Sequence, residues 1–264
     1  MNMFAKITLA VLSAAAVTAC GGGGGGGGGS TGGGCTSGCG GGTPTTPTTP
    51  YYTHAQLAEK FIDYAWTDAS IDATIVKTNT LQSNYIVVYD YDLKTYDAYW
   101  LGGYNPGQDV YDYITYNNDR MYYDLDYNGG NVYEDYWTGV QFEETTATSK
   151  DLAKVAAIKE GVRLKKSADA LKAEFGFSEK RSVEIARMAQ KLASAPKASM
   201  TEKDYDAFAK ELLGSSVNQF KSAITKSMQG SSQDLNKLVD QAAKVNGVGP
   251  EHMNKIVNGL FQEN

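Results

Sequence analysis

Oxygen-bearing side chains recur between residues 124 and 135 at a spacing that suits calcium chemistry. Asp124, Asp126 and Asn128 stand at alternate positions, Gly129 follows directly, and Asp135 closes the segment. Ca²⁺ takes about six to eight oxygen ligands, and a glycine permits the sharp turn that gathers them around one ion. The spacing makes Asp124, Asp126, Asn128 and Asp135 a candidate calcium site.

The same segment resembles the calcium loop of an EF-hand, in which oxygen ligands occupy the first, third, fifth and last positions and glycine the sixth. Three features oppose calcium binding: the flanks alternate like strands, Asp135 is shorter than the usual glutamate, and Asn131 stands at a normally apolar position. The favoured alternative is a β-hairpin with solvated carboxylates, turning at Asn128-Gly129-Gly130.

Aromatic residues form a second group of candidates. Of the 18 tyrosines, 17 lie in residues 51–148, together with all 3 tryptophans. Tyr and Trp offer rigid contact area at low entropic cost and are enriched in recognition surfaces. We expect a face that binds a protein or glycan, made of Tyr99, Trp100, Tyr111, Tyr113, Tyr122, Tyr133 and Trp137. The alternative is cross-strand aromatic pairing that only stabilises the sheet.

No catalytic motif is recognisable in the chain. A nucleophile elbow, a zinc-binding helix and a phosphate-binding glycine loop are all missing, and the two histidines, His54 and His252, lie far apart in the sequence. A non-enzymatic role without a cofactor is therefore favoured. The alternative enzyme would be a hydrolase of envelope polymers that works through paired carboxylates, which are numerous.

The sequence Gly247-Val248-Gly249-Pro250 lies between two expected helices. It resembles the hairpin of helix-hairpin-helix modules, in which backbone amides receive a DNA phosphate. Asn246 and Met253 depart from that family's pattern. A glycine helix cap followed by proline at the first helical position is the favoured explanation of this generic turn, so DNA binding at the cell surface is the less favoured function.

The N-terminal sequence indicates export. Residues 1–19 have the basic start and apolar centre of a signal peptide, and they lead into Val17-Thr18-Ala19-Cys20. These four residues resemble the lipobox of bacterial lipoproteins. The resemblance implies cleavage before Cys20 and attachment of lipid, such as palmitate, to that cysteine. Gly21 in place of aspartate implies an outer-membrane anchor, with the protein facing either the periplasm or the cell surface.

Residues 20–50 are expected to form a disordered tether. Nine consecutive glycines are followed by further Gly, Ser, Thr and Pro residues, which favour flexible or extended chain. Cys35 and Cys39 lie within this segment. A disulfide between them fits an exported protein, and metal binding is the weaker alternative because two thiols leave a zinc ion short of ligands.

The remaining chain divides by charge into residues 51–148 and 149–264. The first part carries 16 acidic and 4 basic residues, a net charge of −12, and the second 14 acidic and 19 basic residues, a net charge of +5. Two domains with differently solvated surfaces would explain this division. The alternatives are that the basic part docks on the acidic part or that each part has its own partner.

Hydrophobic periodicity predicts the secondary structure. Thr53 and Gln56 fit a capping box, and Leu57, Phe61 and Ala65 give the following helix one apolar face. A two-residue period then predicts strands within residues 73–78, 84–91, 96–101, 110–116, 121–127 and 131–142. The short connections between them predict an antiparallel sheet, and we expect the first helix to lie across its packed face.

After residue 148 the period returns to that of a helix. Six apolar stripes, beginning with Leu164, Ala168, Leu171 and Phe175, predict six helices that pack into a bundle. The expected fold class is α+β, with an N-terminal helix and an antiparallel β-meander followed by an all-α helical bundle.

Overall fold

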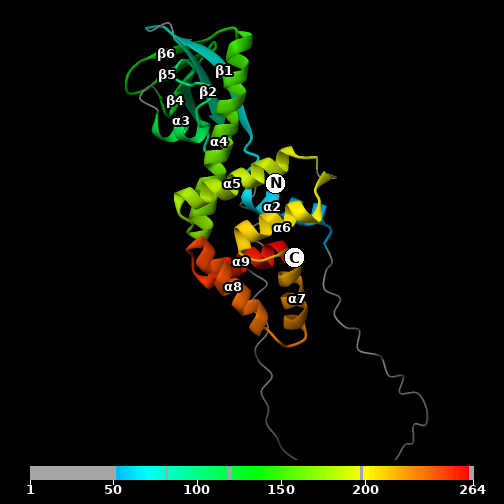
Figure 1. Cartoon of the computed structure of the whole chain (residues 1–264). Helices are drawn as coiled ribbons and strands as arrows, with labels where there is room; N and C mark the ends of the chain where they lie inside the picture. The colour runs from blue at the N-terminus through cyan, green and yellow to red at the C-terminus, as the bar shows by residue number, and fades with distance from the viewer. Residues whose placement is uncertain (1–51, 81–82, 118–120, 197–198, 262–264) are drawn as a thin grey trace, which may run out of the picture. The chain divides into compact units, whose positions relative to one another are not determined.

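The computed structural model describes residues 52–80, 83–117, 121–196 and 199–261. This part of the chain belongs to one compact unit, residues 52–262. It contains a six-stranded antiparallel sheet and eight helices (Figure 1), which confirms the expected α+β fold class. None of the described helices is long and apolar enough to cross a bilayer. The signal peptide, Cys20 and the Cys35–Cys39 pair lie outside the described residues.

The sheet consists of two meanders joined through its central strands. Its strand order is β3-β2-β1-β6-β5-β4, and all described pairings are antiparallel. The first meander comprises β1 (Ile71–Thr78), β2 (Asn84–Asp90) and β3 (Thr95–Trp100). The second comprises β4 (Leu125–Gly129), β5 (Val132–Asp135) and β6 (Gln141–Glu144). The β1–β6 pairing makes the two meanders one sheet.

The sheet curls until its two outer strands approach each other. Ala98 in β3 exchanges two backbone hydrogen bonds with Tyr122, which precedes β4, at 2.8 and 3.1 Å. The concave side is filled by apolar side chains of both meanders: Val76, Tyr85, Val87, Ala98, Leu125, Tyr133 and Phe142. Curling therefore turns one face of the sheet into a core of its own.

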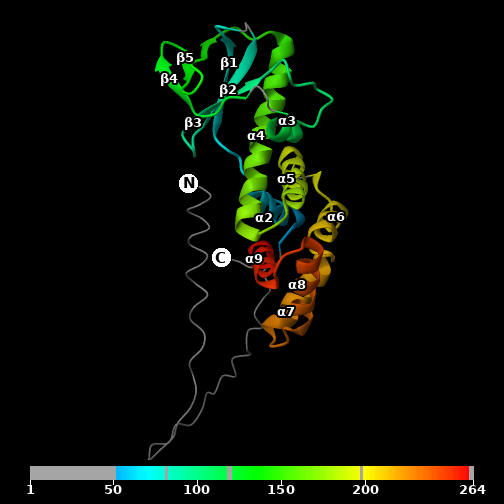
Figure 2. The same ribbon diagram turned by 90° about the vertical axis from the view of Figure 1, so that its left-hand side faces the viewer.

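The convex face is covered by helices. The helix α4 (Ser149–Phe175) runs beside the sheet (Figure 2). Its residues Ile158 and Val162 pack in one cluster with sheet residues such as Ile86 and Val88. The later residues of α4, including Leu171, belong to a second cluster among the helices. One long helix thus contributes to the core under the sheet and to the core of the bundle.

The segment 110–116, expected as a strand, is the helix α3 (Val110–Tyr116). Asp109 caps it, because its carboxylate accepts hydrogen bonds from the backbone N–H groups of Tyr111 and Asp112. The alternation of aromatic and β-branched residues there fits a strand locally. Capping and the burial of Tyr111 and Ile114 on one side of a helix outweigh that preference.

The first described helix, α2 (His54–Ala65), begins at the expected capping box of Thr53 and Gln56. It contacts helices of the bundle and not the face of the sheet where we expected it, since its Phe61 ring lies 3.8 Å from that of Phe208. Its apolar stripe fits any apolar surface of suitable shape, so periodicity could not identify the partner.

The bundle completes the fold with α5 (Glu179–Ser194), α6 (Glu202–Leu213), α7 (Val217–Met228), α8 (Gln233–Asn246) and α9 (Pro250–Phe261). With α4, these are the six helices that the apolar stripes predict. The stripe residues, such as Leu164, Leu171 and Ile185, are buried in one shared cluster.

Candidate functional site

The residues of the expected calcium loop lie on the β4–β5 hairpin. Its turn is at Gly129, Gly130 and Asn131, whose φ angles of 81°, 60° and 65° are all positive, so the favoured hairpin alternative describes this segment. Leu125 pairs with Asp135 at the far end of the ladder from the turn.

The hairpin geometry does not gather the expected calcium ligands. Asp135 is buried and accepts hydrogen bonds from the Thr138 backbone N–H at 2.7 Å and from its hydroxyl at 2.6 Å. Asn128 donates to Glu134 at 2.8 Å. Among the described residues there is no group of three or more His, Cys, Asp or Glu side chains that could hold a metal ion. The hypothesis of calcium binding by Asp124, Asp126, Asn128 and Asp135 therefore receives no support.

The seven residues of the expected aromatic face are dispersed over three cores. Tyr99 and Tyr113 are buried beneath α4, Tyr133 is buried inside the curled sheet, and Tyr111 is buried among the bundle helices. Trp100 and Tyr122 pack partly buried against the inner side of the curled sheet. Only Trp137 is largely exposed, at 85%. These residues do not form one face, because the sheet is covered on both sides.

Many of the remaining tyrosines pair with one another across the strands. The Tyr96 ring centroid lies 4.4 Å from that of Tyr89, 5.3 Å from that of Tyr133 and 6.2 Å from that of Tyr127. This row of rings connects β2 and β3 with β4 and β5 beside the Ala98–Tyr122 bridge. The structural alternative, aromatic pairing that stabilises the sheet, accounts for these tyrosines.

An exposed aromatic pair remains at the turn between β5 and β6. Tyr136 is 72% and Trp137 85% exposed, and their rings contact each other edge to face with centroids 5.3 Å apart. We call these two residues the aromatic tip. The aromatic composition pointed to both residues, but the segment 131–142 was expected to form one strand. The structure divides it into β5 and β6 at the turn that carries this pair.

The turn that carries the aromatic tip is tightly bonded. Besides binding Thr138, Asp135 accepts a backbone hydrogen bond from Gly139 at 2.8 Å and donates one to Val140 at 3.0 Å. Gly139 has a φ of 66°, a conformation that glycine adopts without a Cβ clash. The exposed rings therefore stand on an ordered support, so holding them in place on binding costs little further entropy.

Carboxylates of the β4–β5 ladder lie close to the aromatic tip along the chain. Asp126 is directly opposite Glu134, two residues before Tyr136, and Asp124 precedes the ladder. Residues 121–148 contain six carboxylates and no Lys, Arg or His. Within the described chain, the recorded ion pairs involve other carboxylates. Like charges directly opposite each other on two strands repel, and no recorded ion pair of the described residues neutralises Asp126 or Glu134.

Other acidic residues of the sheet half are neutralised by the helices. Lys166 lies 2.7 Å from Asp90 and 2.9 Å from Asp92, and Arg187 lies 2.6 Å from Asp109. In each pair the acid comes from residues 51–148 and the base from residues 149–264. The uneven charge of the chain is thus partly compensated within the fold.

Two carboxyl groups of the sheet, the buried Asp90 and the partly buried Asp97, have pKa values shifted in opposite directions. Burial acts to raise the pKa of Asp90, but hydrogen bonds from Lys166 and from the backbone of Leu93 and Asp92 hold it below its usual range. Burial raises the pKa of Asp97 to about 6, against a hydrogen bond from the Asp124 backbone N–H, and the Asp124 and Asp90 carboxylates raise it further.

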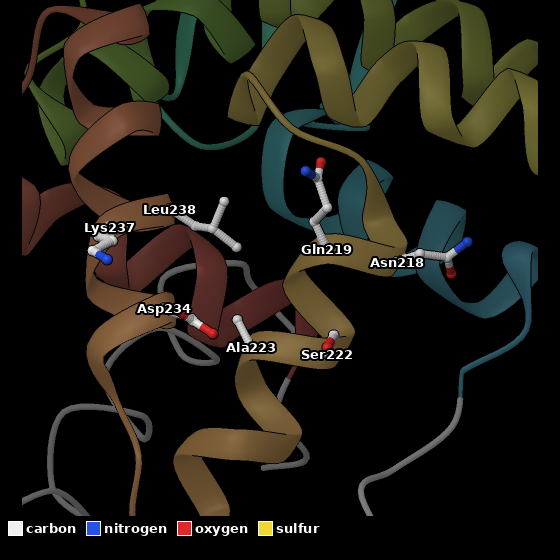
Figure 3. Close-up of a pocket in the computed structure, with 7 residues that line it drawn as sticks. All are labelled: Asn218, Gln219, Ser222, Ala223, Asp234, Lys237 and Leu238. Carbon is white, nitrogen blue, oxygen red and sulfur yellow. The ribbon is translucent and has the colours of Figure 1, made fainter.

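Divergent carboxyl pKa values are what the hydrolase alternative requires, but only at the floor of a pocket. Two hollows of the described chain lie elsewhere. One, of about 460 Å³, lies between α7 and α8 (Figure 3) and is lined by Asn218, Gln219, Ser222, Ala223, Asp234, Lys237 and Leu238. The other, of about 400 Å³, is lined by three carboxylates, Asp63, Asp68 and Glu160, together with Trp66 and Arg163. Arg163 is paired with Asp68 and Glu160, as in a structural ion-pair network. Neither hollow contains Asp90 or Asp97, so the carboxyl groups with divergent pKa values give the hydrolase no support.

The turn that resembles a helix-hairpin-helix module is an ordinary helix cap. Gly247, with a φ of 66°, ends α8, and Pro250 begins α9. The buried Asn246 side chain donates to the carbonyls of Leu212 and Ala242 and accepts from Arg181. Asn246, which departs from the helix-hairpin-helix pattern, therefore has a structural role in this fold.

Comparisons with known protein families, curated proteins and solved structures give no match to this chain.

Proposed function

We propose that this chain is a lipid-anchored exported protein that binds a protein or glycan of the cell envelope through its aromatic tip. The observation that carries the proposal is the exposure of Tyr136 and Trp137 on a hydrogen-bonded turn. A folded protein gains nothing by leaving a tryptophan almost fully in water, whereas a binding surface uses rigid aromatic side chains as anchors.

The N-terminal sequence supports the location. By its resemblance to a lipobox, Val17-Thr18-Ala19-Cys20 attaches the chain to the outer membrane, facing the periplasm or the cell surface. The Gly/Thr/Pro-rich residues 21–50 then act as a tether, about 30 Å long on average, that gives the folded part freedom to reach a partner.

Cosedimentation with purified Gram-negative peptidoglycan sacculi and outer-membrane vesicles tests the binding role. Every chain compared carries Cys20→Ser, so that a lipid anchor cannot insert into the vesicles by itself, and wild type here means the unaltered aromatic tip. The wild type is expected to sediment with at least one of them, and the double variant Tyr136→Ser/Trp137→Ser to remain in the supernatant. The matched control Tyr116→Ser, which removes another exposed aromatic ring, should sediment like the wild type. Equal sedimentation of the tip variant, or none by the wild type, would contradict the proposal.

The anchor is tested separately in a bacterial host. Wild-type protein is expected to incorporate labelled palmitate and to enter the detergent phase on Triton X-114 partitioning, whereas Cys20→Ser should do neither. A Cys35→Ser/Cys39→Ser control should still carry lipid, because these thiols lie outside the lipobox.

A further inference from the structure

We propose that the partner of the aromatic tip is a lysine- or arginine-rich segment of a protein. This inference rests on the proposed binding role of the tip and adds the chemistry of what it binds. The docking surface consists of Tyr136 and Trp137 together with Glu134, two residues before Tyr136 on the same strand end, and its cross-strand partner Asp126.

The aromatic rings favour a cationic side chain. The face of an indole or phenol ring attracts an ammonium or guanidinium group through its quadrupole, and tryptophan does so most strongly. Trp137 and Tyr136 meet edge to face, an arrangement that leaves ring surface open to solvent. Their support by Asp135 and Gly139 keeps this surface in place before a partner arrives.

The adjacent carboxylates determine the sign of the partner's charge. Asp126 and Glu134 repel each other across the strands, and Glu134 is bonded only to the neutral amides of Asn128 and Gln141 among the recorded contacts. An ammonium or guanidinium group placed between the two carboxylates would replace that repulsion with two attractions. A basic segment can provide this cation and a second one for the aromatic tip.

Charge complementarity favours a basic protein segment over other envelope components as the partner. A bilayer with anionic lipids has a negative surface potential, and nucleic acid carries one negative charge per phosphate, so both are repelled by an edge with only acidic residues. A neutral glycan would stack on the rings but would leave the Asp126–Glu134 repulsion unrelieved. The observations therefore favour a basic protein segment.

Fluorescence anisotropy with a labelled deca-lysine peptide tests the inference on the full chain in detergent micelles. The peptide is expected to bind at 25 mM salt, with an affinity at least tenfold lower at 250 mM salt because the contacts are ionic. Both Tyr136→Ser/Trp137→Ser and Asp126→Asn/Glu134→Gln should weaken binding at least tenfold. A deca-glutamate peptide should not bind.

A matched control distinguishes the site from the general negative charge of the chain. Asp240→Asn/Glu251→Gln removes two exposed carboxylates of α8 and α9 and should leave binding within twofold of wild type. Equal weakening in this control, or no peptide binding at 25 mM salt, would overturn the basic-partner inference. If the tip variant also loses envelope binding in cosedimentation, the proposed function stands and only the partner chemistry is wrong.

Salt-insensitive binding of the wild type to phosphatidylcholine vesicles, lost in the tip variant, would also overturn the inference. It would assign the aromatic tip to a lipid surface.

Discussion

Carboxylates of the same half of the chain have two different environments. Asp90, Asp92 and Asp109 face helices α4 and α5, where Lys166 and Arg187 neutralise them. Asp126 and Glu134, on the β4–β5 ladder, face each other, and no base of the described chain is paired with them. The neutralised carboxylates Asp90, Asp92 and Asp109 therefore belong to the internal structure. The carboxylates Asp126 and Glu134 are available to a partner outside the molecule.

The largest expected difference between the two sets appears when a neutralising base is removed. The Lys166 and Asp90 side chains are only 19% and 8% exposed, so Lys166→Met would leave a nearly buried carboxylate without its counter-charge. We expect a loss of about 3 kcal/mol in the free energy of unfolding at pH 7, measured by urea denaturation. Lys226→Met, which breaks the exposed pair with Asp234, should cost less than about 1 kcal/mol. A similar loss in the free energy of unfolding for Lys166→Met and Lys226→Met would contradict the expectation that the buried ion pair contributes more to stability than the exposed one.

Asp97 provides the second test, because no recorded ion pair among the described residues involves its carboxyl group. Its pKa is raised to about 6, mainly by burial, so the folded state binds a proton more tightly than the unfolded state. Stability is therefore expected to fall as the pH rises from about 4 to about 6. Asp97→Asn should raise the free energy of unfolding at pH 7 by about 2 kcal/mol and change it little at pH 4.

Urea denaturation of both proteins between pH 4 and pH 7 provides the measurement. The difference between the two curves isolates Asp97 from Asp90, whose lowered pKa has the opposite effect on stability. A difference that stays constant with pH would contradict a raised pKa for Asp97.

Neutralising single carboxylates should have opposite signs in the two sets. Asp126→Asn removes a repulsion with Glu134 and is expected to increase the free energy of unfolding by about 0.5 kcal/mol. Asp92→Asn removes an attraction with Lys166 and should decrease it by a similar amount, since this aspartate is half exposed. Chemical denaturation at low salt, where screening is weakest, would measure both. Equal signs would show that the two sets do not differ.

The smallest effect on stability is expected at the aromatic tip. Tyr136→Ser/Trp137→Ser should change the free energy of unfolding by less than about 0.5 kcal/mol, because both rings are already in water. Tyr133 is close to the tip in the chain but is buried in the curled sheet, so Tyr133→Ser should lower the free energy of unfolding by about 3 kcal/mol. Thermal and urea unfolding of both variants would check this. A large loss in the tip variant would mean that its rings have a structural role.

Local signals in the sequence predicted many elements correctly. The capping box at Thr53 begins α2, and the stripe from Leu164 to Phe175 is buried along α4. Asn128-Gly129-Gly130 predicted the β4–β5 turn. These predictions succeed because capping, positive φ angles and helical periodicity depend on residues close together in the chain.

Predictions failed where contacts with residues distant in the sequence determine the secondary structure or the packing partner of a segment. Val110–Tyr116 alternates like a strand, but Tyr111 packs in the bundle core and Ile114 in the core under the sheet, which stabilises a helix. The one local signal for this helix was Asp109 at its N-cap, which the alternation outweighed. The apolar stripe of α2 shows that one face is covered, and only the tertiary structure shows that the bundle covers it.

The amino-acid sequence alone was enough to predict the α+β fold class, and it shows directly the order of the acidic and basic parts and the concentration of tyrosine and tryptophan in residues 51–148. Which aromatic rings are exposed and which carboxylates are neutralised became known from the tertiary structure. The physical reason is that alternation along a strand assigns side chains to two faces without stating what covers either face. Curling buries one face, α4 covers the other, and Tyr136 and Trp137 are left in water at the turn.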